Sequence, residues 1–155
     1  SRRRGAGGQA PAAQSMQVVA GWLRERLAAA GVELTFDDAG LSLPLPPEAL
    51  EQVLSNLVGN ALDALAGGGA GRIELRTCAR DGLLCLEVAD DGPGIAPELR
   101  ARILQPFYST KPLGHGLGLG LSIVADLVES AGGRLEITER PGGGALVRAC
   151  WPAAS

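Results

Sequence analysis

Aromatic side chains, lysine, histidine and long apolar runs are all scarce in this sequence of 155 residues. Aromatic residues make up 3% of it, so a hydrophobic core has to be built from aliphatic side chains. No apolar run approaches the length that spans a bilayer, and no signal peptide is visible, so we expect no membrane contact by this chain. The net charge of -3, without a basic stripe, argues against a nucleic-acid-binding surface.

Cysteine is also sparse. Cys78, Cys85 and Cys150 form no C-x-x-C pair and have no metal-ligand spacing, which predicts free thiols in a reducing cytoplasm. The chain does not begin with Met, so we expect a fragment of a longer protein. If that protein crosses a membrane, we expect its membrane segment outside this chain.

The composition is otherwise that of a globular domain, with 46% hydrophobic and 20% charged residues. Residues 1–15 are predicted to be a flexible leader, and residues 16–152 one domain. Hydrophobic periodicity predicts helices over 16–30, 46–65, 98–103 and 119–131, and strands over 32–36, 41–45, 72–79, 83–90, 134–138 and 145–151. Helices mixed with hairpins favour an α/β fold, a two-layer sandwich of a mixed sheet with helices on one face.

A row of polar residues interrupts the apolar helix predicted over 46–65. Gln52, Asn56, Asn60 and Asp63 follow one another at spacings of four, four and three, so they share one helix face. Amide and carboxylate oxygens in line can bind a hard cation such as Mg²⁺. The alternative is a partly solvated helix edge, because Asn is usually exposed.

A carboxylate ends the most apolar predicted strand. Leu84, Leu86, Val88 and Asp90 alternate and point to one buried face, and a buried carboxylate needs a partner. An exocyclic amine such as that of adenine would serve as the donor. Gly92 and Gly94 would let a flat ring approach the backbone. The alternative is a plain turn, for which Asp-Gly is common chemistry.

Glycine recurs at every second position just before the last predicted helix, in the run Gly114-His115-Gly116-Leu117-Gly118-Leu119-Gly120-Leu121. Its backbone N–H groups and the helix dipole would suit a triphosphate. The spacing is not a Rossmann fingerprint, and no Walker A motif is present. Lys111, the only lysine, and His115, the only histidine, are candidate phosphate contacts. The alternative for each is a solvated residue of a loop. For His115 a phosphate contact is favoured over that alternative.

Four segments together resemble the motifs of the GHKL superfamily of ATPases and kinases. They are the N box at 56–64 (NLVGNALDA), the G1 box at 90–95 (DDGPGI), the F box of histidine kinases at 106–111 (PFYSTK) and the G2 box at 116–121 (GLGLGL). The order of the four motifs is also that of the family. The subgroup that the chain resembles is that of the nitrogen- and dicarboxylate-sensing histidine kinases.

This resemblance implies the Bergerat fold and a site for ATP and Mg²⁺ under a lid formed by 105–117. Asn60 would be the metal ligand and Asn56 would lie beside it, and both are the expected catalytic positions. Asp90 would bind the adenine amino group. The expected nucleotide-binding residues are Asn60, Asp63, Asp90, Gly92, Gly94, Ile95, Phe107, Thr110, Lys111, His115, Gly116, Leu117, Gly118, Leu119, Gly120 and Leu121.

Asn56 separates the branches of this superfamily. In the gyrase, MutL and Hsp90 branches a Glu stands four residues before the metal-binding Asn and activates water. An amide cannot act as that base. The resemblance therefore implies phosphoryl transfer to a protein histidine, with a GHKL ATPase as the alternative. Further alternatives are an anti-sigma-type serine kinase and a degenerate module that binds no nucleotide.

Two departures from the family pattern are visible. Ala145 stands where the family often has Thr, and residues 1–30 contain no phosphoacceptor histidine. We therefore expect this chain to need a separate dimerisation and phosphoacceptor domain of the same parent protein as its substrate. A response regulator would act downstream. The chain would be a cytoplasmic domain of a parent anchored in the inner membrane.

Overall fold

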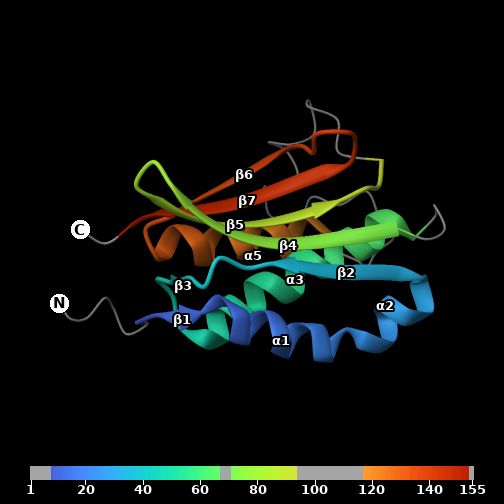
Figure 1. Cartoon of the computed structure of the whole chain (residues 1–155), viewed down its shortest axis with the longest axis horizontal. Helices are drawn as coiled ribbons and strands as arrows, with labels where there is room; N and C mark the ends of the chain where they lie inside the picture. Colours follow the sequence, from blue (N-terminus) through green and yellow to red (C-terminus); the bar gives the residue numbers. More distant parts are fainter. Residues whose placement is uncertain (1–7, 67–70, 94–116, 154–155) are drawn as a thin grey trace.

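The computed structural model describes residues 8–66, 71–93 and 117–153 of the chain. These residues form two layers, a five-stranded mixed sheet and a set of helices packed on one of its faces (Figure 1). The two-layer α/β architecture predicted from the sequence is therefore confirmed. No helix among these residues is both long and apolar enough to cross a membrane.

The main sheet has the strand order β2-β4-β5-β7-β6. Its strands are β2 (Val32–Asp37), β4 (Gly71–Arg80), β5 (Leu83–Asp90), β6 (Arg134–Glu139) and β7 (Ala145–Pro152). β2 pairs with β4 in parallel, and the other neighbouring strands are antiparallel. Two short strands, β1 (Ala10–Pro11) and β3 (Ser42–Leu43), form a separate antiparallel pair. The predicted strand over 41–45 is thus shorter than expected.

The described helices are α1 (Ala12–Trp22), α2 (Arg24–Ala30), α3 (Pro47–Leu65) and α5 (Leu117–Ser130). The single helix predicted over 16–30 is wrong in one respect, because it breaks at Leu23, whose φ and ψ of -102° and 5° leave the helical range. Gly31 ends α2 in the left-handed conformation that glycine tolerates. The predicted short helix over 98–103 lies outside the described residues.

The predicted leader boundary is also wrong. Residues 10–15 lie in β1 and the first turns of α1 rather than in a leader, and Ala10 and Ala12 are fully buried. The backbone N–H of Ala12 donates to the Leu41 carbonyl at 2.9 Å, which ties this segment to the chain next to β3. Small apolar side chains in a Gly/Ala-rich stretch fit here because the contact with β3 leaves little space.

Strand alternation places the core between the sheet and the helices. Leu86, Val88 and Asp90 of β5 lie opposite buried residues of β4 in register. Leu84 alternates with these three, so all four share the face that α3 and α5 cover. On α3 the buried stripe consists of Leu50, Val53, Leu54, Leu57, Val58, Ala61, Leu62 and Leu65. Each fully buried aliphatic side chain of this kind contributes about 1.5–3 kcal/mol.

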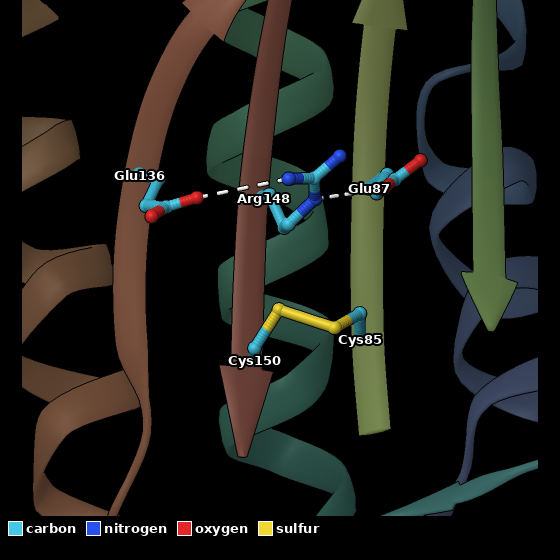
Figure 2. The surroundings of a disulfide bond; sticks show 5 residues. All are labelled: Cys85, Glu87, Glu136, Arg148 and Cys150. Atoms are coloured by element: carbon cyan, nitrogen blue, oxygen red, sulfur yellow. Dashed lines mark hydrogen bonds and ion pairs between the residues drawn. A yellow bond between two sulfur atoms is a disulfide. The ribbon is translucent and has the colours of Figure 1, made fainter. Parts of the chain in front are cut away.

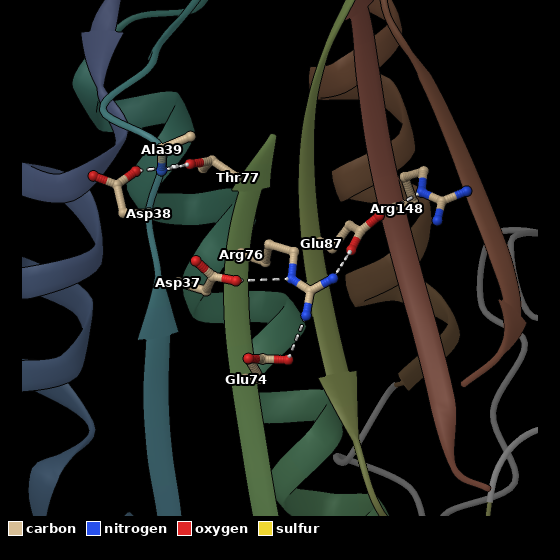
Figure 3. Close-up of polar contacts among 8 residues, drawn as sticks. All are labelled: Asp37, Asp38, Ala39, Glu74, Arg76, Thr77, Glu87 and Arg148. Carbon is tan, nitrogen blue, oxygen red and sulfur yellow. Dashed lines mark hydrogen bonds and ion pairs between the residues drawn. The ribbon is translucent and has the colours of Figure 1, made fainter. Parts of the chain in front are cut away.

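The opposite face of the sheet carries a chain of charged side chains that crosses all five strands. Figure 3 shows its part from β2 to β7. Arg76 of β4 contacts Asp37 at 3.4 Å and Glu74 at 3.3 Å. Glu87 of β5 lies between Arg76 at 3.9 Å and Arg148 of β7 at 2.8 Å. Arg148 also reaches Glu136 of β6 at 3.7 Å. This polar pattern explains why the helices cover only the other face.

The same outer face carries a disulfide between β5 and β7 (Figure 2). Cys85 and Cys150 are partners in the strand register, with Cα atoms 4.2 Å apart. The prediction of free thiols is therefore wrong for these two residues and right for Cys78, which is partly exposed. Cysteines separated by 65 positions give no pairing signal in the sequence, because the register of β5 against β7 is what brings them together.

Reduction of this disulfide is expected to lower the free energy of unfolding by about 2–4 kcal/mol. The intact bridge closes a long loop in the unfolded chain and so lowers the conformational entropy of that state. The measurement is urea unfolding of the Cys78→Ser chain with and without a reductant. The Cys78→Ser/Cys85→Ser/Cys150→Ser chain is the control, since a reductant should leave its midpoint unchanged. Equal midpoints for the Cys78→Ser chain in both conditions would show that the bridge does not stabilise the fold.

Candidate functional site

The four polar residues predicted to share one helix face all lie on α3, outside its buried apolar stripe. Asn56 and Asn60 are half-buried, whereas Gln52 and Asp63 are exposed. The neighbouring face of the helix is the apolar stripe that packs into the core. This packing sets the rotation of α3 about its axis, and with it the direction of the polar row. Asn56 and Asn60 therefore lie at the border of the core, as side chains that meet a ligand would.

The amide of Asn60 lies against the start of α5. A Cβ atom built on Gly120 would be 3.8 Å from Asn60 Oδ1 and 3.9 Å from Nδ2. Nδ2 is buried and has no hydrogen-bond partner among the described residues. A buried polar atom without a partner is costly, by about 1–3 kcal/mol. This N–H donor thus fits a site in which an acceptor atom of a polar ligand completes its contacts.

Asp63 lies about one turn further along α3 and contacts α2. Its carboxylate contacts Arg26 of α2 at 3.5 Å, and 38% of its side chain is exposed. A Cβ atom built on Gly59 would also lie 3.7 Å from that guanidinium, so Arg26 covers this part of the helix. A role for Asp63 in ligand binding stays a prediction.

Asp90 ends β5 as a carboxylate that is only 6% exposed. Its Oδ1 accepts the backbone N–H of Gly92 at 2.9 Å, and the backbone N–H of Ala145 is a second donor. Burial raises the pKa of Asp90 above its ordinary value, and these two N–H groups and nearby Arg140 oppose that rise. The predicted buried acceptor at the strand end is thus present.

Close packing around Gly92 brings the chain after β5 against the end of α3. A Cβ atom on Gly92 would lie 3.2 Å from the Leu65 side chain and 3.0 Å from Asp90 Oδ1. The Asp91 carboxylate accepts the backbone N–H of Arg72 at 2.8 Å, which fixes the chain just after β5. These contacts place Asp90 at the same end of the fold as Leu65, the last residue of the helix that carries Asn60.

The start of α5 is the third part of the site. The helix begins at Leu117, two residues before the predicted start, so its first four N–H groups are those of Leu117, Gly118, Leu119 and Gly120. Such groups and the helix dipole favour an anion. Leu121 was expected to line the phosphates, but its side chain is 2% exposed and belongs to the core.

Seven predicted site residues lie outside the described residues, as does nearly all of the predicted lid over 105–117. They are Gly94, Ile95, Phe107, Thr110, Lys111, His115 and Gly116. Among the described residues, α3 contacts both the start of α5, at Asn60 and Gly120, and the end of β5, at Leu65 and Gly92.

Sequence reasoning missed the contribution of the turn before β7. The backbone carbonyl of Asp90 lies against Gly144, whose φ is +105°, and a Cβ atom there would overlap with it. Ala145, noted in the sequence for lacking a hydroxyl, contributes its backbone N–H instead. The run Gly142-Gly143-Gly144 indicated unusual backbone geometry. The sequence did not indicate that Asp90 would be the residue packed against it.

Among the described residues, no group of three or more His, Cys, Asp or Glu side chains could hold a metal ion. Of the described residues, the amides of α3 are therefore the groups that could hold a metal at this site, together with oxygens of the bound ligand. Mg²⁺ is commonly bound in that way, by one or two protein oxygens together with substrate phosphates.

Comparison with known proteins agrees with this arrangement. The family model described as "Histidine kinase-, DNA gyrase B-, and HSP90-like ATPase" matches residues 46–155. The C4-dicarboxylate transport sensor protein DctB of Rhizobium meliloti (strain 1021) is 40% identical over 112 residues, which cover 66% of this chain and 18% of that protein. The chain thus spans about a fifth of the length of this relative.

Two solved structures show the same fold over nearly all of the chain. The catalytic domain of histidine kinase ThkA, in a nucleotide-free form, has a TM-score of 0.83 and 26% identity, with 96% of both chains covered. Full-length ShkA in complex with AMPPNP has a TM-score of 0.79 and 31% identity, with 99% of this chain and 33% of that chain covered. The chain belongs to the family of histidine kinase-, DNA gyrase B- and HSP90-like ATPases, and its relatives there include sensor histidine kinases.

Proposed function

We propose that this chain binds ATP with Mg²⁺ and transfers the γ-phosphoryl group to a histidine of a separate dimerisation and phosphoacceptor domain. The observation that carries the proposal is the pairing of Asn56 with Asn60 on the border of α3. An amide at position 56 offers no general base for water, so ATP can be held without rapid hydrolysis. The relatives, which include sensor histidine kinases, support the same assignment.

Each described part of the site has a role in this proposal. Asp90 accepts a hydrogen bond from the adenine amino group, and its buried position makes that bond selective. The N–H groups at the start of α5 bind phosphate oxygens. Asn60 holds Mg²⁺, with Asn56 nearby. Bound Mg²⁺ neutralises charge on the phosphates, which is the main requirement of phosphoryl transfer.

The partners follow from the same assignment. ATP is the phosphoryl donor, the phosphoacceptor domain of the parent protein is the substrate, and a response regulator receives the phosphoryl group downstream. We place this chain in the cytoplasm, as one domain of a parent anchored in the inner membrane.

The direct test is phosphorylation in trans. The chain is mixed with radiolabelled ATP, Mg²⁺ and the phosphoacceptor domain of its parent. We expect acid-labile phosphohistidine on that domain, no label on the chain itself and slow release of phosphate without the acceptor. Rapid ATP hydrolysis with no transfer would instead favour the ATPase alternative.

Asn60→Ala is expected to weaken ATP binding in the presence of Mg²⁺ by about 10- to 100-fold, because the amide oxygen would be a ligand of the metal. Binding measured with a chelator should change by less than about threefold. The measurement is fluorescence titration with a labelled ATP analogue. Gln52→Ala, an exposed amide on the same helix, is the control and should bind like the unmodified chain. A loss of equal size with and without Mg²⁺ would contradict the metal role.

A further inference from the structure

A cavity lies on the outer face of the sheet, far from the nucleotide site. It has a volume of about 420 Å³ and lies where the β4–β5 turn, the end of β7 and the start of β6 meet. Leu83 stands at its rim, at the opposite end of β5 from Asp90. The volume falls in the range of about 300–1,000 Å³ that is typical of small-molecule sites.

The charges around this cavity favour an anion. Three arginines and two carboxylates line it, which leaves one net positive charge. Arg148 is held by Glu87 at 2.8 Å and by Glu136 at 3.7 Å. Arg80 and Arg134 are exposed and form no ion pair with any described residue. These two guanidiniums are therefore available to carboxylates of a ligand.

The wall of the cavity also holds a reactive group, the Cys85–Cys150 disulfide (Figure 2). Cys85 is 3% exposed, whereas Cys150 is partly exposed, so a reagent in the cavity reaches Cys150 more easily. Leu83 and Pro152 add apolar surface beside it. Cys78, which lies opposite Cys85 on β4, does not line the cavity.

From these features we infer that the cavity is a thiol-exchange site for a small thiol that carries carboxylates. Arg80 and Arg134 bind the carboxylates, and the thiolate of the ligand attacks Sγ of Cys150. A new sulfur–sulfur bond forms between ligand and Cys150 while the Cys85–Cys150 bond breaks. Cys85 leaves as a thiolate and takes a proton from water. The ligand sulfur is oxidised, Cys85 is reduced, and no further oxidant is required.

The consequence is a covalent modification of β7 that opens the bridge to β5. These two strands supply Ala145 and Asp90 at the other end of the sheet. The proposal does not depend on the kinase assignment, because the cavity and the bridge are separate from the nucleotide site.

The first test uses glutathione and the Cys78→Ser chain with its bridge intact. Samples are quenched with acid, and intact-mass and peptide-mapping mass spectrometry identify the product. We expect a mixed disulfide with one glutathione on Cys150 and a free thiol at Cys85. An adduct that forms mainly on Cys85, or a purified chain in which both cysteines titrate as free thiols, would overturn the proposal.

The second test compares mercaptopropionate with cysteamine, two short thiols of opposite charge, at equal thiolate concentration. We expect the anionic thiol to react about 3- to 10-fold faster at low salt. The preference should fall below about twofold in Arg80→Gln/Arg134→Gln and at high salt. Arg24→Gln, an exposed arginine on α2, is the matched control and should keep the preference. Equal rates for the two thiols in the Cys78→Ser chain would refute a carboxylate-binding role.

Discussion

Asp90→Asn is expected to weaken ATP binding about 10- to 100-fold, because a carboxylate accepts a hydrogen bond from an amine more strongly than an amide does. Asp90 is buried at the end of β5, and its orientation is held by the Gly92 and Ala145 N–H groups. The measurement is calorimetric titration with ATP. Asp81→Asn removes the same charge in the turn before β5, at the opposite end of the strand, where the side chain is exposed, and should change affinity by less than about threefold.

Asp90→Asn should not destabilise the fold at neutral pH. Burial raises the pKa of Asp90 above its unfolded value. A group with a raised pKa contributes stability at pH values below its unfolded pKa, and that contribution is lost as the pH rises through the folded pKa. Asn has no ionised form, so its contribution to stability does not fall as the pH rises. Urea unfolding should therefore show Asp90→Asn to be at least as stable as the parent chain at pH 7. As the pH falls, the free energy of unfolding of the parent chain should rise relative to that of the variant. In the ATP titration, an unchanged affinity of Asp90→Asn would instead support the alternative of a degenerate module that binds no nucleotide.

Gly144→Ala is expected to lower the free energy of unfolding by about 2–6 kcal/mol, from a strained backbone and a steric overlap together. The φ of Gly144 is +105°, and a Cβ atom there would collide with the backbone carbonyl of Asp90. Moving that carbonyl also displaces the carboxylate, so ATP binding should fall as well. Urea unfolding and ATP titration measure the two effects.

Gly143→Ala is the matched control for this prediction. The φ of Gly143 is +110°, but a Cβ atom there would meet nothing within 4 Å. The control therefore carries only the backbone strain, about 1–3 kcal/mol. The difference between the two variants measures the contact with Asp90. If both variants lose the same stability, the close approach of Gly144 to β5 is not a determinant of the fold.

Local patterns were sufficient for several elements of the fold. The strand over 83–90 was predicted with its observed bounds, because four apolar or buried residues alternate along it and turns flank it. The helix over 46–65 was predicted within one residue of α3, because its apolar stripe has helical spacing and a proline marks its start. Both signals are contained in neighbouring residues, so no knowledge of the sheet was needed.

Other features depended on which strands become neighbours. The break of the first helix at Leu23 and the packing of β1 against β3 left no clear pattern in the sequence. Leu121 was assigned to the phosphate side from its motif, but the direction of its side chain is set by the rotation of α5 against the core. Such rotations follow from packing between elements rather than from the residues of one element.

The sequence by itself determined the chemistry of the nucleotide site: amides at 56 and 60, a carboxylate at 90 and a glycine-rich start of the last helix. These are properties of single residues and short spacings. Only the tertiary structure decided that Gly144 and Ala145 meet Asp90, and that Cys85 meets Cys150. The physical reason is that the strand register joins residues about 55–65 positions apart, and a shift by one residue would turn every side chain to the other face.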